Sequence, residues 1–225
     1  MPARNVIKPY VENGAYHLYN RGVEKRLLFL DGMDYGVLLR YLKEYLLTKD
    51  TDNLSKRLSD PNTSYKEKDT ILKLIRLNNF SESLNLLAYC LMPNHFHFLV
   101  RQTGANTIDQ FMQSLCTRYT MYFNRKYKRV GTLFQSVYKA VLVDNDEQFL
   151  HLTRYIHRQA LASQGETLQD QPSSNPEYLS DRKSPWVHPE EILAFFSKTL
   201  PHLSYMSFVK EKEDSEIIKK LTLED

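Results

Sequence analysis

Two histidines separated by a single phenylalanine are the residues whose spacing first suggests chemistry. His95 and His97 stand near the start of an apolar run, MPNHFHFLV over residues 92–100, which predicts a β-strand. Alternate side chains of a strand point to the same face, so the two imidazoles project together. Phe96 and Phe98 then turn to the other face, toward the core. Two imidazoles on a rigid strand supply half of a divalent-metal site, and the other half must come from elsewhere.

A later segment supplies candidates for that other half. Residues 146–163 predict an amphipathic helix on which Tyr155 and Gln159 are four apart and share one face. A phenol and an amide oxygen beside two histidines give two nitrogen ligands, one oxygen ligand and a nucleophile. Mg²⁺ or Mn²⁺ suits such a site and can polarise a phosphodiester during in-line displacement. A tyrosine hydroxyl, with an ordinary pKa of about 10, needs help from a metal or a basic neighbour.

Simpler readings exist for the neighbouring residues. Tyr119 and Tyr122 are rival nucleophiles, but Tyr119 lies on the apolar stripe of a predicted helix and reads as core. A DNA contact by Tyr122 stays open as an alternative. His151 lies one turn before Tyr155 and reads as a solvated residue, although it could reach the site. His157 falls on a different helix face and is left out of the site.

The elements that must position these residues alternate in type along the chain. Hydrophobic periodicity predicts four strands and three long helices in the order β-α-β-β-α-β-α. This order matches a ferredoxin-like split β-α-β arrangement, an α+β fold with an antiparallel sheet and one added helix. Helices on one face would leave the other face or an edge free for a substrate. The strands are expected at 15–23, 84–92, 95–101 and 137–143, and the helices at 31–47, 107–128 and 146–163.

Two stretches lie outside this core. Residues 48–83 are polar and read as an insertion with a short helix at 65–77, for which the sequence offers no function. We expect a first domain over residues 1–163, including this insertion, and a C-terminal loop and helical extension over residues 164–225. The extension is predicted to contain a loop over residues 164–184, a short helix over 189–198 and a charged helical tail over 205–223. We expect this tail to be solvated from Lys210 onward.

Composition restricts the class of protein. Hydrophobic residues make up 42% of the 225 residues, enough for a real core, and the net charge of +3 says little about partners. Cys90 and Cys116 are the only cysteines, and their apolar surroundings predict reduced thiols. No apolar stretch approaches the roughly 20 residues that a membrane span needs, and the N-terminus has no apolar signal core. We therefore expect a cytoplasmic protein.

A basic segment, residues 124–139, contains five cationic side chains and no acid. Three aromatic residues are interleaved with these charges. Basic groups can contact phosphates, and rings can stack on bases with roughly 1–3 kcal/mol per base. The pattern favours single-stranded or hairpin DNA over reading of a duplex major groove. The cations are Arg125, Lys126, Lys128, Arg129 and Lys139, and the rings are Tyr127, Phe134 and Tyr138.

Several segments together resemble a known family. The His-Phe-His strand with its preceding LMPN, and the helix segment RYIH, resemble the single-tyrosine HUH transposases of the IS200/IS605 type, in particular the REP-associated tyrosine transposases. Their order along the chain is more specific than the histidine pair alone. The resemblance covers about residues 14–160 apart from the insertion, and weakly 189–196. Further matching segments are YHLYNRG at 16–22, RYTMYFNR at 118–125 and GTLFQSVYKA at 131–140.

The resemblance implies an activity and roles for particular residues. It implies that His95 and His97 hold a divalent metal, Mg²⁺ or Mn²⁺. It further implies that Tyr155 attacks single-stranded DNA, forms a 5′-phosphotyrosine and releases a 3′-hydroxyl. By the same resemblance Arg21 and Lys25 are phosphate contacts. The implied protein is a metal-dependent transposase or nickase that acts on hairpin DNA.

The third metal ligand is where this chain departs from its relatives. The family places a polar ligand one turn after the tyrosine, which is Gln159 here. REP-associated relatives commonly read Arg-Asn-Pro where residues 158–160 of this chain read Arg-Gln-Ala. A glutamine still offers an amide oxygen, and without the proline the helix can continue further.

Other functions and assemblies stay open at this stage. The first rival function is a domesticated, non-catalytic DNA-binding protein of the same fold. The second is a metal-dependent nuclease that uses water in place of the tyrosine. Members of the family are often dimers, some with the tyrosine helix donated in trans, so a homodimer is a further open alternative.

Overall fold

The computed structural model describes residues 10–162, 171–197, 199, 201–211 and 215–222. Within these ranges four strands form one antiparallel sheet in the order β2-β3-β1-β4. Their bounds are Ala15–Arg21 for β1, Leu84–Met92 for β2, His95–Gln102 for β3 and Lys139–Val143 for β4. The predicted α+β fold with an antiparallel sheet is therefore confirmed.

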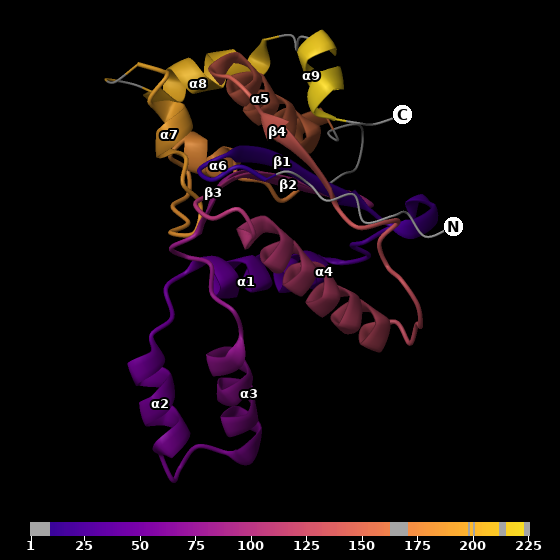
Figure 1. The fold of residues 1–225 in the computed structure, drawn as a ribbon, viewed down its shortest axis with the longest axis vertical. Helices are drawn as coiled ribbons and strands as arrows, with labels where there is room; N and C mark the ends of the chain where they lie inside the picture. Colours follow the sequence, from indigo (N-terminus) through magenta and orange to yellow (C-terminus); the bar gives the residue numbers. More distant parts are fainter. Residues whose placement is uncertain (1–9, 163–170, 198, 200, 212–214, 223–225) are drawn as a thin grey trace.

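Each of two long helices connects strands that are not neighbours. Helix α1 (Gly32–Leu46) joins β1 to β2 with β3 lying between them, and α4 (Thr107–Lys126) joins β3 to β4 across β1. Both helices lie on the same side of the sheet (Figure 1). The core between them and the sheet is apolar and includes Leu38, Leu42, Phe96, Phe98, Phe111, Leu115 and Tyr119.

The opposite side of the sheet is also covered. Helix α5 (Asp146–Ala162) lies there with α6 (Asn175–Tyr178), α7 (Glu190–Leu193), α8 (Pro201–Lys210) and α9 (Ser215–Leu221) (Figure 1). The expectation of a face left free was wrong, because apolar residues of the extension bury themselves against α5. This second cluster includes Leu152, Ile156, Tyr178, Ile192, Tyr205, Ile218 and Leu221.

The charged tail was predicted to be solvated, and for α9 this was wrong. Ile218 and Leu221 are buried, and α9 contacts both α5 and β4. The predicted loop also contains the short helix α6, while its residues 164–170 lie outside the described ranges. The helix predicted at 189–198 is shorter and corresponds to α7.

The insertion forms a helical hairpin of α2 (Thr51–Ser59) and α3 (Tyr65–Arg76) that projects away from the sheet (Figure 1). Helix α3 was predicted, whereas α2 was not. Ser64 and Glu67 form a capping box at the start of α3, which explains where that helix begins. Among the residues of these two helices Ile71 alone is buried, so the hairpin contributes little to the core.

A short 3₁₀ turn, η1 (Val23–Lys25), follows β1. It ends the strand at Arg21, earlier than predicted. Both cysteines are free thiols, as predicted, with Cys90 buried and Cys116 half-buried. Within the described ranges, every helix is too short or too polar to cross a bilayer.

Candidate active site

The pairing of β1 with β3 gathers polar side chains on the sheet face that lies under α5. Arg21 is paired with His95, and Tyr19 is paired with His97. Residues directly opposite each other in an antiparallel pair point to the same face. The ring centroids of His95 and His97 are 4.9 Å apart, so the two imidazoles do project together.

Helix α5 brings Tyr155 to this group. The Tyr155 ring meets the His97 ring edge-on, with centroids 5.4 Å apart and planes at 82°. Leu152 and Ile156, both fully buried, hold this stretch of α5 against the sheet. Gln159 follows one helical turn after Tyr155 and is half-buried. The structure thus brings Tyr155 next to the His95 and His97 pair, with Gln159 one turn further along the same helix.

Both histidines have a ring nitrogen that could bind a metal. The Nε2 atom of His97 is buried and has no hydrogen-bond partner in the part of the chain that the structure describes. The Nδ1 atom of His95 lies 2.6 Å from Oδ1 of Asn94 and donates to it, because an amide oxygen can only accept. In a neutral His95 the Nε2 atom therefore carries the lone pair.

Electrostatics keep this pair neutral. Burial, together with a smaller contribution from the nearby charge of Arg21, lowers the pKa of His95 to about 4. Burial also holds the pKa of His97 well below its ordinary value, with additional contributions from His17, His95 and Arg21. Neutral imidazole is the form that binds metals. An orphaned buried nitrogen beside a second neutral imidazole fits a divalent metal.

The third ligand must be of another residue type. Within the described ranges, no group of three or more His, Cys, Asp or Glu side chains is arranged to hold a metal ion. An amide oxygen such as that of Gln159, or an oxygen of the substrate, would complete the set.

Three of the predicted DNA contacts lie around the histidine strand. Arg21 is next to His95 in the sheet. Lys139 is exposed, and its ammonium lies 5.5 Å from the centre of the Tyr19 ring, which is itself opposite His97. Lys25 is exposed in η1, and its carbonyl accepts a hydrogen bond from the side chain of Asn94.

The rest of the basic segment is tied to the same end of β1. The backbone N–H of Val23 donates to Leu133, and that of Gln135 donates to Arg21, both at 2.9 Å. Arg125 and Lys128 are exposed at the end of α4 and just beyond it. Arg129 is half-buried and donates to the side chain of Asn124. Residues 133 and 135 of the segment are thus held beside β1 and η1.

Two predicted DNA contacts are placed elsewhere. The ammonium of Lys126 lies 2.7 Å from a carboxylate oxygen of Asp31 and 2.7 Å from one of Asp34. Tyr138 is only 5% exposed, and its hydroxyl is hydrogen-bonded to Asp109 and Tyr10. Ion pairs engage the side chain of Lys126 and burial encloses that of Tyr138, so this structure does not favour a DNA contact by either, and both contacts stay predictions.

Comparison with known proteins finds one family to which part of the chain is similar. A family model described as "Transposase IS200 like" matches residues 62–159, a range that holds His95, His97, Tyr155 and Gln159. Residues 62–159 of this chain are therefore similar to the IS200-like transposases.

Solved structures and curated proteins complete this comparison. One similar structure is a REP-associated tyrosine transposase bound to a REP hairpin, at 10% identity over 80% of this chain and 94% of that chain, with a TM-score of 0.49. Another is a putative transposase from Deinococcus radiodurans, at 17% identity over 68% of this chain and 95% of that one, with a TM-score of 0.27. No curated protein matches the chain.

Sequence reasoning missed one residue at the candidate site. His17 is fully buried, and its Nε2 atom lies 2.9 Å from Nδ1 of His97. Alternation along AYHLYNR places His17, Tyr19 and Arg21 on one face, so a signal was present in the first strand. The alternation indicates which face of the strand His17 occupies, but it does not indicate that His17 contacts His97.

The rival residues have other contacts in this structure. Tyr119 is buried in the core and donates to a backbone carbonyl, as predicted. The hydroxyl of Tyr122 donates to Asp34. The guanidinium of Arg154 donates to His151. His157, which was left out of the site, is hydrogen-bonded to Tyr205 and Ser174.

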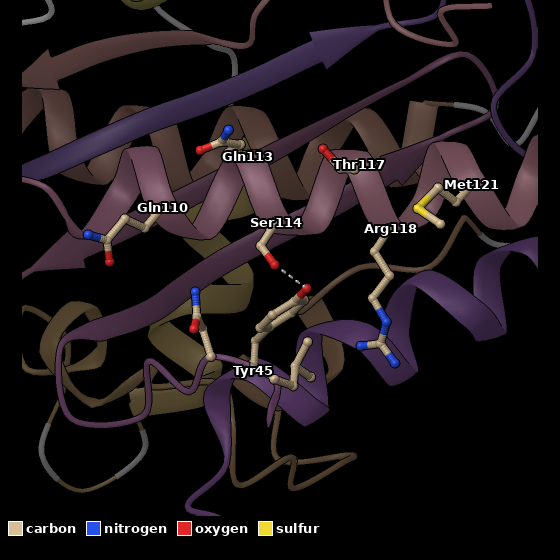
Figure 2. Close-up of a pocket in the computed structure, with 9 residues that line it drawn as sticks. Tyr45, Gln110, Gln113, Ser114, Thr117, Arg118 and Met121 are labelled. Atoms are coloured by element: carbon tan, nitrogen blue, oxygen red, sulfur yellow. Dashed lines mark hydrogen bonds between the residues drawn. The ribbon is translucent and has the colours of Figure 1, made fainter. Parts of the chain in front are cut away.

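A groove of 480 Å³ lies between α1 and α4, on the side of the sheet away from Tyr155. Figure 2 shows Gln110, Gln113, Ser114 and Thr117 of α4 along it, with the Ser114 hydroxyl 2.6 Å from that of Tyr45. Its one guanidinium, that of Arg118, is paired with Glu44 and lies over the ring of Tyr41. The groove contains no residue of the predicted site and offers no free charge to a ligand.

Proposed function

We propose that this protein is a metal-dependent transposase or nickase that cleaves and rejoins single-stranded, hairpin-forming DNA through a 5′-phosphotyrosine intermediate. One observation carries the proposal. The ring of Tyr155 lies 5.4 Å from that of His97, whose Nε2 atom is buried without a partner in the described part of the chain. The similarity of residues 62–159 to the IS200-like transposases supports the same conclusion.

His95, His97 and Gln159 would hold Mg²⁺ or Mn²⁺. A divalent ion there would polarise the scissile phosphate and offset the negative charge that develops during displacement. Burial of the imidazoles keeps their nitrogen lone pairs available at neutral pH. Gln159 would be the third ligand through its amide oxygen, as predicted from the sequence.

Tyr155 would supply the attacking oxygen. The bond between this oxygen and phosphorus forms while the bond from phosphorus to the 3′ oxygen breaks. The phenol loses its proton, and the departing 3′ oxygen gains one. Tyr155 is only 7% exposed, so water has little access to the ester that forms. Attack by a 3′-hydroxyl on that ester would then rejoin a strand and release the tyrosine.

The DNA would be held by the cations around the histidine strand. Arg21, Lys25 and Lys139 lie nearest the site, while Arg125, Lys128 and Arg129 extend this basic surface along the segment after α4. Contacts to phosphates position a strand without reading its sequence.

We propose that the core is a ferredoxin-like split β-α-β sheet with α5 as an added catalytic helix. The proposed catalytic domain spans 1–163 with an insertion at about 48–83, followed by the extension 164–225.

The test uses the full chain, Mn²⁺ and a broad panel of end-labelled single-stranded hairpins. A denaturing gel separates cleaved DNA from DNA attached covalently to protein. We expect both products from the unaltered chain and neither from Tyr155→Phe. The matched control is Tyr65→Phe, which removes the hydroxyl of a tyrosine that is 89% exposed on α3 and should change nothing.

Two other results would assign a different function. Binding without cleavage or adduct across the whole panel would favour a non-catalytic DNA-binding protein of this fold. Cleavage without an adduct, unaffected by Tyr155→Phe, would favour a nuclease that uses water.

A further inference from the structure

A chain of hydrogen bonds runs from the C-terminal helix to His97. The Nδ1 atom of His17 lies 2.7 Å from the backbone carbonyl oxygen of Leu221, although the two residues are 204 apart in sequence. The Nε2 atom of the same ring lies 2.9 Å from Nδ1 of His97. Both imidazoles are fully buried, so water does not compete for these bonds.

The Leu221 carbonyl determines which atom donates and which accepts in each of these hydrogen bonds. A carbonyl oxygen can only accept, so Nδ1 of His17 must carry a proton. A neutral imidazole has one N–H, so Nε2 of His17 is then an acceptor. The bond between the rings must therefore be donated by Nδ1 of His97. The reverse direction would make His17 a buried cation, and no carboxylate in the described ranges forms an ion pair with it.

This direction leaves the Nε2 atom of His97 unprotonated. It is the same atom that is buried without a hydrogen-bond partner in the described part of the chain. An isolated neutral histidine favours the opposite form, with the proton on Nε2. Without His17, therefore, the proton of His97 would tend to occupy the position where a metal ligand needs its lone pair.

We propose that His17 is a positioning residue that holds His97 in its Nδ1–H form, with the carbonyl of Leu221 in α9 fixing His17 in turn. The proposal rests on the metal site of the proposed function and adds residues that bind no metal themselves. Partners of this kind orient a ligating imidazole and typically contribute about 10–100-fold to metal affinity.

The location of the carbonyl explains why α9 can play this part. Leu221 is the last residue of α9, and the final carbonyls of a helix have no partner within the helix. The ring of His17 donates a hydrogen bond to the carbonyl oxygen of Leu221. Ile218 and Leu221 anchor α9 in the core against α5 and β4, which keeps the carbonyl in place.

The first test needs neither metal nor DNA. Nitrogen NMR of the full chain with ¹⁵N-labelled histidine distinguishes the two neutral forms of each ring. We expect the Nδ1–H form for both His17 and His97 in the metal-free protein. The Nε2–H form at His97 would overturn the proposal, and this measurement decides it even if the protein were to bind no metal at all.

The second test compares two substitutions of His17 by titration with Mn²⁺. His17→Leu removes the acceptor, and we expect about 10–100-fold weaker binding together with a shift of His97 toward its Nε2–H form. His17→Gln keeps an amide oxygen that can accept from His97, and we expect most of the affinity to return.

A matched control separates positioning from stability. Tyr119→Phe removes a buried hydrogen bond to a backbone carbonyl on the other side of the sheet and should leave Mn²⁺ affinity unchanged. Equal affinity in the unaltered chain and His17→Leu, or equal losses in the Leu and Gln variants, would refute the role of His17. Absence of Mn²⁺ binding in the unaltered chain would instead refute the proposed metal site.

Discussion

At the scale of single residues, this site depends on which atom of each ring is engaged. His95 uses Nδ1 on Asn94, and His97 uses Nδ1 on His17, so both leave Nε2 toward the proposed metal. The spacing of the pair was visible in the sequence, because strand alternation is local. The sequence did not show that His17 is the partner of His97, because His17 is itself held by Leu221, which is 204 residues away in the sequence.

The same scale separates two lysines of the basic segment by their exposure and their ion pairs. Lys139 is exposed, whereas Lys126 is held by Asp31 and Asp34. The basic and aromatic pattern of residues 124–139 could not distinguish them, since it shows neither burial nor partners. The pattern likewise did not show that Tyr138 is buried.

Binding of a labelled hairpin, measured by fluorescence anisotropy over a range of salt concentrations, tests this distinction. Each phosphate contact on a single strand contributes about 0.7 to the slope of log affinity against log salt. Lys139→Ala should weaken binding and reduce the slope by about that amount. Lys126→Ala should leave the slope unchanged, and a reduced slope in that variant would show that its ion pairs open on DNA.

At the scale of elements, the turn η1 fits closely over the start of the histidine strand. The backbone N–H of Gly22 donates to the carbonyl of Asn94 at 2.9 Å. A Cβ atom added at Gly22 would lie 2.2 Å from the carbonyl oxygen of Arg26, closer than atoms can approach. The glycine therefore permits the turn that carries Lys25 beside the site.

Gly22→Ala should destabilise the protein by about 1–3 kcal/mol, the usual cost of overpacking, as measured by urea unfolding. Gly36→Ala is the control, because Gly36 lies in α1 and a Cβ atom added there would have no neighbour within 4 Å. Alanine there should stabilise the helix by up to about 1 kcal/mol. Equal effects of the two substitutions would contradict a close fit at η1.

Ionic contacts join the start of α1 to the end of α4. The buried carboxylate of Asp34 accepts hydrogen bonds from Lys126, Tyr122 and Tyr127. Burial alone would raise the pKa of Asp34, but the bonds from Lys126, the backbone of Leu30 and the tyrosines outweigh it and lower that pKa. A lowered pKa means that the folded state favours the charged carboxylate.

The stability that this carboxylate contributes is present above its unfolded pKa of about 3.9 and is lost as pH falls through the lower folded value. Asp34→Asn should therefore cost about 3 kcal/mol at pH 7, and the difference from the unaltered chain should shrink below about pH 4. Urea unfolding across this range measures it. Asp50→Asn, at the exposed cap of α2, should change little at any pH, and a pH-independent cost at Asp34 would contradict the assignment.

Elements with a clear local pattern were predictable from the sequence. The strand at 84–92 was placed with both bounds correct, because its apolar run is bordered by polar and turn residues. Helix α9 was missed as a packed element, since its seven residues carry a glutamate and two lysines that mask Ile217, Ile218 and Leu221. Burial of so short a helix depends on α5, which the local sequence cannot show.

At the scale of the whole molecule, the C-terminal extension shares a core with the proposed catalytic helix. Leu152 and Ile156 of α5 are buried in the same cluster as Tyr178, Tyr205 and Leu221. The projecting hairpin of α2 and α3 contributes only Ile71 to burial. We therefore expect the C-terminal extension to contribute more to stability than the hairpin of α2 and α3.

Two deletions should reveal this difference in thermal unfolding followed by circular dichroism. Replacing residues 51–76 by a short flexible linker should leave a cooperative transition near that of the full chain. Removing residues 164–225 should abolish the transition or lower its midpoint strongly, because it exposes the apolar side of α5. A truncated chain as stable as the full one would show that the extension is dispensable.

The central claim is that Tyr155 is the residue that joins the DNA, and peptide mapping of the trapped complex tests it most directly. Arg154 and Arg158 flank the segment Tyr155–His157, so trypsin releases the peptide YIHR with a single tyrosine. After nuclease trimming, mass spectrometry should find this peptide carrying a nucleotide through its 5′-phosphate. A nucleotide on any other tyrosine, or cleaved DNA with the peptide unmodified, would contradict the account.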